Sequence, residues 1–177
     1  MRKIAFILIL FFGITANAQD VHFSQFLANN FALNPARVGM QNNDCKTTLH
    51  RKSQWASVSI PFTTFGLALE RKEILPSHNI GVQFLNDIAG DSRFKTSGLT
   101  IAYAKSVAIS KENTFSFGAG LGIFQRSILF DDLVFNETEN LNNLNFMFPD
   151  LSIGVANENR INKNVVLESG IAFFHIN

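Results

Sequence analysis

Large apolar residues alternate with small residues along most of the chain beyond residue 46. In segment 114–123, for example, Phe115, Phe117, Leu121 and Ile123 alternate with glycine, serine and threonine. A period of two is typical of a β-strand, whose successive side chains point to opposite faces. The pattern predicts an all-β chain of about seven strands. The clear segments are 64–70, 79–85, 97–106, 114–123, 150–156 and 165–173, and the weaker seventh is 47–57.

The second face of these strands is unusual because it carries Gly, Ala, Ser and Thr and almost no Lys or Glu. A soluble β-sandwich would place charged residues on its outer face. Large apolar residues on one face and small residues on the other favour an antiparallel up-and-down transmembrane β-barrel, with lipid outside and a lumen inside. Glu70 and Glu168 fall on the presumed lumen face, with Arg51 and Lys105 as possible partners. Glycines at lumen positions would allow strong coiling or the close approach of a plug.

The connecting segments alternate in length. Segments 71–78, 108–113 and 158–164 are short, whereas 86–96 and 127–149 are longer. Outer-membrane barrels have short periplasmic turns and longer extracellular loops, so we expect 127–149 to lie outside the cell. The N-terminus is then expected in the periplasm.

The first eighteen residues have the order of a secretory signal peptide. Arg2 and Lys3 precede an apolar run over 4–14, and Ala16-Asn17-Ala18 provides a cleavage site. The alternative is a buried N-terminal helix. We predict a signal peptide over 1–18, a periplasmic segment over 19–45, and a partial outer-membrane β-barrel over 46–177.

Segment 20–40 has a different pattern. Phe23, Phe26, Leu27 and Phe31 have helical spacing, and Asn34-Pro35 should end the helix because a residue before proline avoids the α region. Gly39 can supply a turn with positive φ. The segment is predicted to be a short amphipathic cap on the sheet; the alternative is a plug or docking segment at the periplasmic mouth.

The sequence offers no catalytic motif, metal site or cofactor site. The net charge of +1 gives no basic surface for nucleic acid. The single cysteine cannot form an internal disulfide, and the four histidines are too far apart in sequence to suggest a ligand set. The glycine-rich run 118–122 sits in a strand without a following Lys-Ser/Thr, so it cannot cradle a phosphate. The prediction is a protein that is not an enzyme.

Several short motifs, taken in order, resemble the N-terminal part of PorP/SprF-type proteins. They lie at 23–26, 34–39, 51–55, 79–90, 115–118 and 149–154 and span essentially the whole mature chain. The signature positions, whose role is structural or in docking, are Phe23, Ser24, Gln25, Asn34, Pro35, Gly39, Arg51, Gln54, Trp55, Asn86, Asp87, Pro149 and Asp150.

The resemblance implies an outer-membrane β-barrel of Bacteroidetes that belongs to the type IX secretion and gliding-motility system. Its implied partners are outer-membrane lipid, components of the secretion system and a secreted adhesin-like cargo protein, whose secretion or surface attachment it would assist. Two other functions stay open on the residues alone: a soluble exported β-barrel that binds a small ligand, and a small outer-membrane pore.

The number of predicted strands bears on barrel closure. Bacterial single-chain barrels have an even number of strands, and an open edge would leave backbone groups unpaired in hydrocarbon. Members of the resembled family are also longer. We therefore expect the 177 residues to form roughly the first half of a larger barrel.

The signal-peptide prediction has a direct test. Edman sequencing or intact mass of the exported protein should give a mature chain that starts at Gln19, because cleavage is expected after Ala18. Retention of Met1 in protein recovered from the cell envelope would contradict it.

Overall fold

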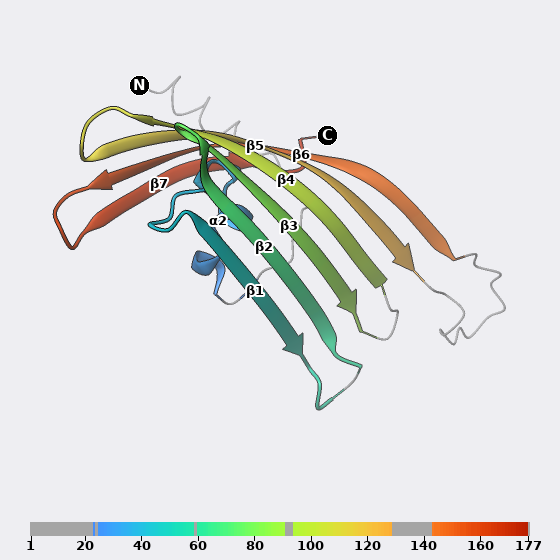
Figure 1. Cartoon of the computed structure of the whole chain (residues 1–177). Helices are drawn as coiled ribbons and strands as arrows, with labels where there is room; N and C mark the ends of the chain where they lie inside the picture. The colour runs from blue at the N-terminus through green and yellow to red at the C-terminus, as the bar shows by residue number, and fades with distance from the viewer. Residues whose placement is uncertain (1–22, 24, 59, 91–93, 129–142, 177) are drawn as a thin grey trace, which may run out of the picture.

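The computed structural model is a strongly curled half-barrel of seven antiparallel strands (Figure 1). It describes residues 23, 25–58, 60–90, 94–128 and 143–176. Three short helical turns precede the strands: η1 (Phe26–Ala28), α2 (Asn30–Leu33) and η2 (Pro35–Arg37). The strands are β1 (Cys45–Gln54), β2 (Phe62–Leu75), β3 (His78–Ala89), β4 (Phe94–Ala108), β5 (Asn113–Ile128), β6 (Leu144–Arg160) and β7 (Val166–Phe173).

Each strand pairs with the next in sequence, which confirms the predicted all-β, up-and-down architecture. The register of β4 and β5 runs from Lys95 opposite Ser127 to Ala108 opposite Thr114. Most strands are longer than their apolar alternation suggested, because backbone pairing continues after the alternation fades. β6, for example, is 17 residues long, whereas its alternation covers only 150–156. None of the helices in the described part of the chain is long and apolar enough to span a membrane.

Alternate turns lie at opposite ends of the sheet, and the β1–β2 and β5–β6 connectors at one end are longer than any turn at the other (Figure 1). The β2–β3, β4–β5 and β6–β7 turns share one end, which we call the short-turn end, and the β2–β3 turn has only residues 76–77 outside the strands. The prediction of a longer loop over 86–96 is wrong. β3 and β4 extend through most of this range, so only residues 90–93 lie outside the strands. Part of the 127–149 connector, residues 129–142, lies outside the described residues, as do the predicted signal peptide and Ser24.

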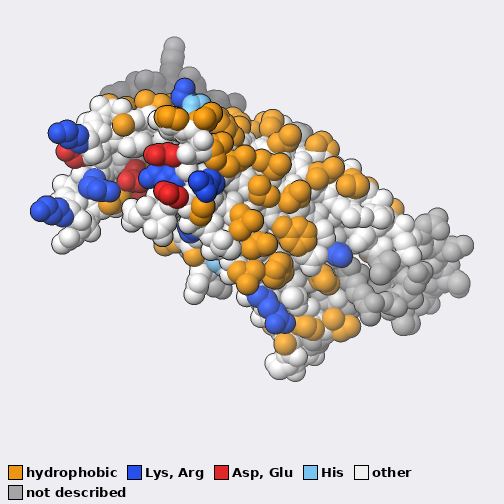
Figure 2. All heavy atoms as spheres, in the orientation of Figure 1, with side chains coloured by type: hydrophobic (Ala, Val, Ile, Leu, Met, Phe, Trp, Pro, Cys, Tyr) orange, Lys and Arg blue, Asp and Glu red, His pale blue; other side chains and the backbone are white. Residues whose placement is uncertain are grey.

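The two faces of the sheet differ as predicted. The outer face is apolar and open, with Leu121 65% and Ile171 68% exposed, whereas Ala102 and Ala104 on the inner face are fully buried. Figure 2 shows hydrophobic side chains gathered over the middle of the strands and charged side chains gathered at the short-turn end. Trp55 follows β1 at the end of the sheet opposite the short-turn end. The Tyr103 ring packs near His78, the first residue of β3, and so lies toward the short-turn end.

The expected pairing of Arg51 and Lys105 with the lumen glutamates is wrong. Arg51 lies one residue from His50, which contacts the inner segment, and Lys105 lies next to the inward-facing Ala104. Because neighbouring residues in a strand point to opposite faces, both cations lie on the outer face. Glu70 and Glu168 have partners from the N-terminal segment, inside the curl of the sheet.

The N-terminal segment, described at Phe23 and over residues 25–44, lies within the curl of the sheet near the short-turn end (Figure 1). The predicted single helix is wrong, because Asn29 has extended backbone and its side chain caps α2 by accepting a hydrogen bond from Ala32 N. The predicted stop at Asn34-Pro35 is confirmed, since Asn34 is also extended.

Candidate functional site

The inner face of the sheet forms a trough that fits the N-terminal segment closely. A Cβ added at Gly118 would overlap the backbone of Pro35 and Ala36, and one added at Gly81 would lie 2.9 Å from the Phe31 ring. Five strands each supply a glycine at which an added Cβ would crowd the segment. These glycines are Gly66, Gly81, Gly118, Gly154 and Gly170. The expectation that inner-face glycines allow close approach of a plug is confirmed for this segment.

Asn34 is the most fully bonded side chain of the segment. Its amide nitrogen donates to the carbonyl oxygens of Val155 on β6 (3.0 Å) and Ile171 on β7 (3.2 Å). Its amide oxygen accepts from Ala36 N at 2.8 Å and so caps η2, in which Pro35 occupies the first turn. One side chain therefore starts a helical turn and bridges two strands.

Charged contacts hold the C-terminal half of the segment. Arg37 Nη2 donates to Glu168 Oε2 on β7. Gly39 N donates to Glu70 Oε2 on β2 at 3.2 Å, and Lys46 lies directly opposite Glu70 in the β1–β2 register. Gly39 has φ +80°, a conformation that favours glycine, so its predicted positive-φ turn is confirmed.

Apolar contacts hold the rest of the segment. The Phe23 ring stacks on His50 at a centroid distance of 4.8 Å and covers Gly66. Phe31 and Val38 form a small core with Ala102 and Ala104 of β4. Together with the polar contacts, these reach every strand from β1 to β7.

The signature residues fall into two groups. Phe23, Asn34, Pro35 and Gly39 lie at the interface between segment and sheet, and Gln25 is exposed beside them. The others are spread over the sheet and do not meet in one site. Arg51, Gln54 and Trp55 lie at the end of β1. On β3, Asn86 accepts a hydrogen bond from Ser97 Oγ, and Asp87 accepts one from Thr64 Oγ1. On β6, Pro149 lies on the outer side and Asp150 contacts His175.

Sequence reasoning missed Arg37 and the contacts of Phe31 and Val38. Arg37 pairs with a residue 131 positions away, which no local pattern reveals. One signal was present, because glycines on the small-residue face leave space that some other part of the molecule must fill.

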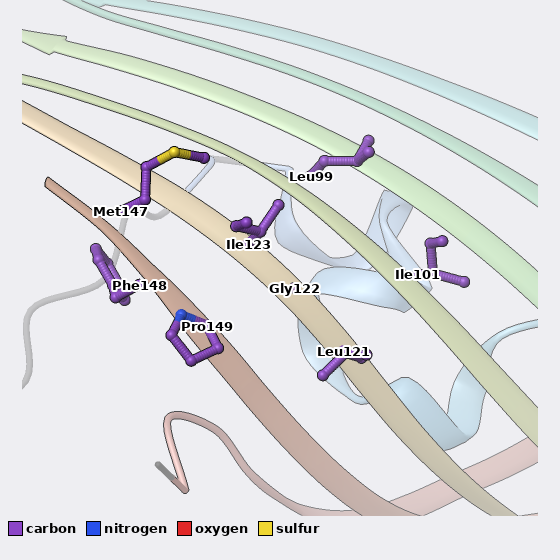
Figure 3. Close-up of a pocket in the computed structure, with 8 residues that line it drawn as sticks. All are labelled: Leu99, Ile101, Leu121, Gly122, Ile123, Met147, Phe148 and Pro149. Carbon is purple, nitrogen blue, oxygen red and sulfur yellow. The ribbon is translucent and has the colours of Figure 1, made fainter.

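An apolar groove of about 410 Å³ lies on the outer face, over β4, β5 and β6 (Figure 3). Leu99, Leu121, Met147 and Pro149 are among its lining residues. Its walls offer hydrocarbon and almost no hydrogen-bonding group, so it suits an acyl chain better than a polar ligand.

In the described residues, no group of three His, Cys, Asp or Glu side chains comes together to hold a metal ion.

The trough predicts a position-specific effect of adding a methyl group. Gly118→Ala should loosen the segment, because its Cβ meets backbone that cannot move aside, at a cost of about 1–3 kcal/mol. Limited trypsin digestion of the folded protein should then cut faster after Arg37, as measured by mass spectrometry.

Gly120→Ala is the matched control. It lies two residues away on the same face, but its Cβ would crowd only the Ser152 hydroxyl. Equal cleavage after Arg37 in the two variants would contradict the close fit at Gly118.

Comparison with known proteins identifies the family. The family model described as type IX secretion system membrane protein PorP/SprF matches residues 15–167. No match is found among curated proteins or among solved structures. The match covers the segment and almost all of the sheet, and it confirms the resemblance carried by the short motifs. The chain belongs to the PorP/SprF family of type IX secretion system membrane proteins.

Proposed function

We propose that this chain is a non-enzymatic outer-membrane component of the type IX secretion system that assists the secretion or surface attachment of particular cargo proteins. The observation that carries the proposal is the apolar outer face of a curled sheet in a chain of the PorP/SprF family. Family membership supports the secretion context, and the arrangement of the two faces supports a role for the sheet as a membrane wall.

The outer face suits a bilayer. Leu99, Ile101, Leu121 and Ile153 are 45–65% exposed. Figure 2 shows hydrophobic side chains gathered over the middle of the strands. Contiguous exposed apolar surface of this extent marks contact with a membrane or a partner. β2 to β6 have 12 to 17 residues, more than the roughly 9–11 that a tilted strand needs to cross the hydrocarbon. Charged side chains gather beyond the band, where water and headgroups would solvate them.

The inner face argues against the soluble, ligand-binding alternative. A lipocalin-like barrel holds its ligand in an internal cavity. Here the N-terminal segment fills the inner face near the short-turn end, and the apolar groove opens on the outside.

The short-turn end is proposed to face the periplasm, which places the N-terminal segment at the periplasmic mouth. Short turns are periplasmic in outer-membrane barrels, and the mature N-terminus would remain on the side where export delivers it. On the segment, Leu27 is 67% exposed, so this end presents an apolar side chain to periplasmic components of the secretion system.

The membrane assignment predicts a depth-dependent cost of charge on the outer face. Leu121→Arg, in the middle of β5, should destabilise the membrane-folded protein by about 2–4 kcal/mol, whereas Gln125→Arg, near the end of the same strand and face, should cost about 0–1 kcal/mol. Urea unfolding in lipid vesicles measures both values.

Cell fractionation supplies the second arm of this test. The wild-type chain should sediment with outer membranes and resist extraction by salt. Recovery as soluble periplasmic protein, together with equal stability of the two arginine variants, would support the soluble alternative and overturn the proposal.

A further inference from the structure

The interface between the N-terminal segment and the sheet is less completely bonded than the sheet itself. In the part of the chain that the structure describes, the buried side-chain nitrogen and oxygen atoms without a hydrogen-bond partner all lie on the segment or on residues that contact it. They are Arg37 Nε, Gln41 Nε2 and Oε1, His50 Nε2 and Glu70 Oε1. Because buried polar atoms lose their hydration without a replacement bond, this interface is held more weakly than the paired strands.

The apolar part of the interface is small and lies against small residues. In the described part of the segment the buried apolar side chains are Phe23, Phe31, Pro35, Ala36 and Val38, whereas Leu27 is exposed. The Phe23 and Phe31 rings lie over Gly66 and Gly81, and Phe31 and Val38 pack with Ala102 and Ala104. Departure of the segment would expose these side chains, but it would not break the backbone pairing between strands.

The connection to β1 is suited to act as a hinge. Residues 41–44 are a series of bends outside any strand, and Asn42, Asn43 and Asp44 are exposed. Lys72 on β2 holds both ends of this stretch, because its Nζ donates to Gln41 O at 3.3 Å and its backbone N donates to Asp44 O at 2.7 Å. Reorientation of the stretch would break the side-chain contact to Gln41, while Asp44 O stays bonded and β1 stays paired with β2 over Cys45–Gln54.

One ion pair ties the segment to the far side of the curl. Arg37 reaches Glu168 on β7, and the two side chains are 17% and 35% exposed. Glu158 lies directly opposite Glu168 in the β6–β7 register and has the same charge, so Arg37 neutralises one member of a like-charged pair. An ion pair at this level of exposure is strong enough to bias the position of the segment and weak enough to break.

We propose that the N-terminal segment, described at Phe23 and over 25–44, is a releasable plug. It detaches as a unit from the inner face, turns about 41–44, and is held in the bound position by the Arg37–Glu168 ion pair. Its release uncovers the glycine trough and opens the inside of the curl at the short-turn end, while the seven paired strands remain intact. The proposed movement of the segment does not depend on the identity of the cargo.

A thiol-accessibility experiment in isolated outer membranes tests the proposal. Val38 is fully buried between segment and sheet, so Val38→Cys in a Cys45→Ser background should react with a membrane-impermeant maleimide only when the segment is released. Adding Glu168→Gln should raise the labelling rate about two- to fivefold, the size expected for loss of a partly exposed ion pair. Higher salt should accelerate labelling only while Glu168 is present.

Two controls separate release of the plug from other events. Glu158→Gln makes the same chemical change on the neighbouring strand without removing the ion pair, so it should change the rate much less than Glu168→Gln does. Ser152→Cys, a buried inner-face position on β6, reports unfolding of the sheet and should react much more slowly than Val38→Cys. Equal rates in the Glu168→Gln and Glu158→Gln variants, or labelling of Ser152→Cys as fast as Val38→Cys, would overturn the proposal.

Discussion

The close fit of the N-terminal segment against the inner face decides which residues that face can carry. The contact requires glycine where the segment crosses Gly118, because any side chain there would meet the backbone of Pro35 and Ala36. Since the segment touches all seven strands, the curvature of the sheet and the path of the segment must suit each other. Asn34 illustrates this dependence, because its amide bridges β6 and β7 from inside the curl.

The same constraint explains why the two faces have such different compositions. A face that must accept the segment at short distance is built from small residues, and Ala102 and Ala104 are fully buried against Phe31 and Val38. The large apolar residues are consequently on the outer face, where Leu121 and Ile171 remain open. In a PorP/SprF membrane protein, lipid is the environment that suits that face.

Local sequence patterns were sufficient to predict the sheet. Alternation identified the strands and their two faces, because side-chain direction in a strand depends only on whether the position is odd or even. The same rule, applied to Arg51 and Lys105, would have excluded them as partners of the glutamates. Strand ends such as Leu144–Arg160 were underestimated because paired backbone does not need apolar alternation.

The site was less predictable because its contacts join distant parts of the chain. Asn34 and Val155 are 121 residues apart, and Arg37 and Glu168 are 131 apart. Helical spacing of the phenylalanines suggested one helix, but Asn29 and Asn34 use their side chains to cap separate short turns. Such capping competes with helix continuation, and tertiary contacts decide between them.

Disulfide cross-linking shows directly which face of the sheet the segment contacts in the membrane. In a Cys45→Ser background, Val38→Cys should form a disulfide with Gly81→Cys, because a Cβ at Gly81 would lie 3.1 Å from the Val38 side chain. Paired with Val82→Cys, the next residue, it should not, since Val82 points to the outer face. Cross-linking observed by non-reducing gel electrophoresis at position 81 but not 82 is the predicted result. Equal cross-linking at both positions, or at 82 alone, would contradict a segment held inside the curl.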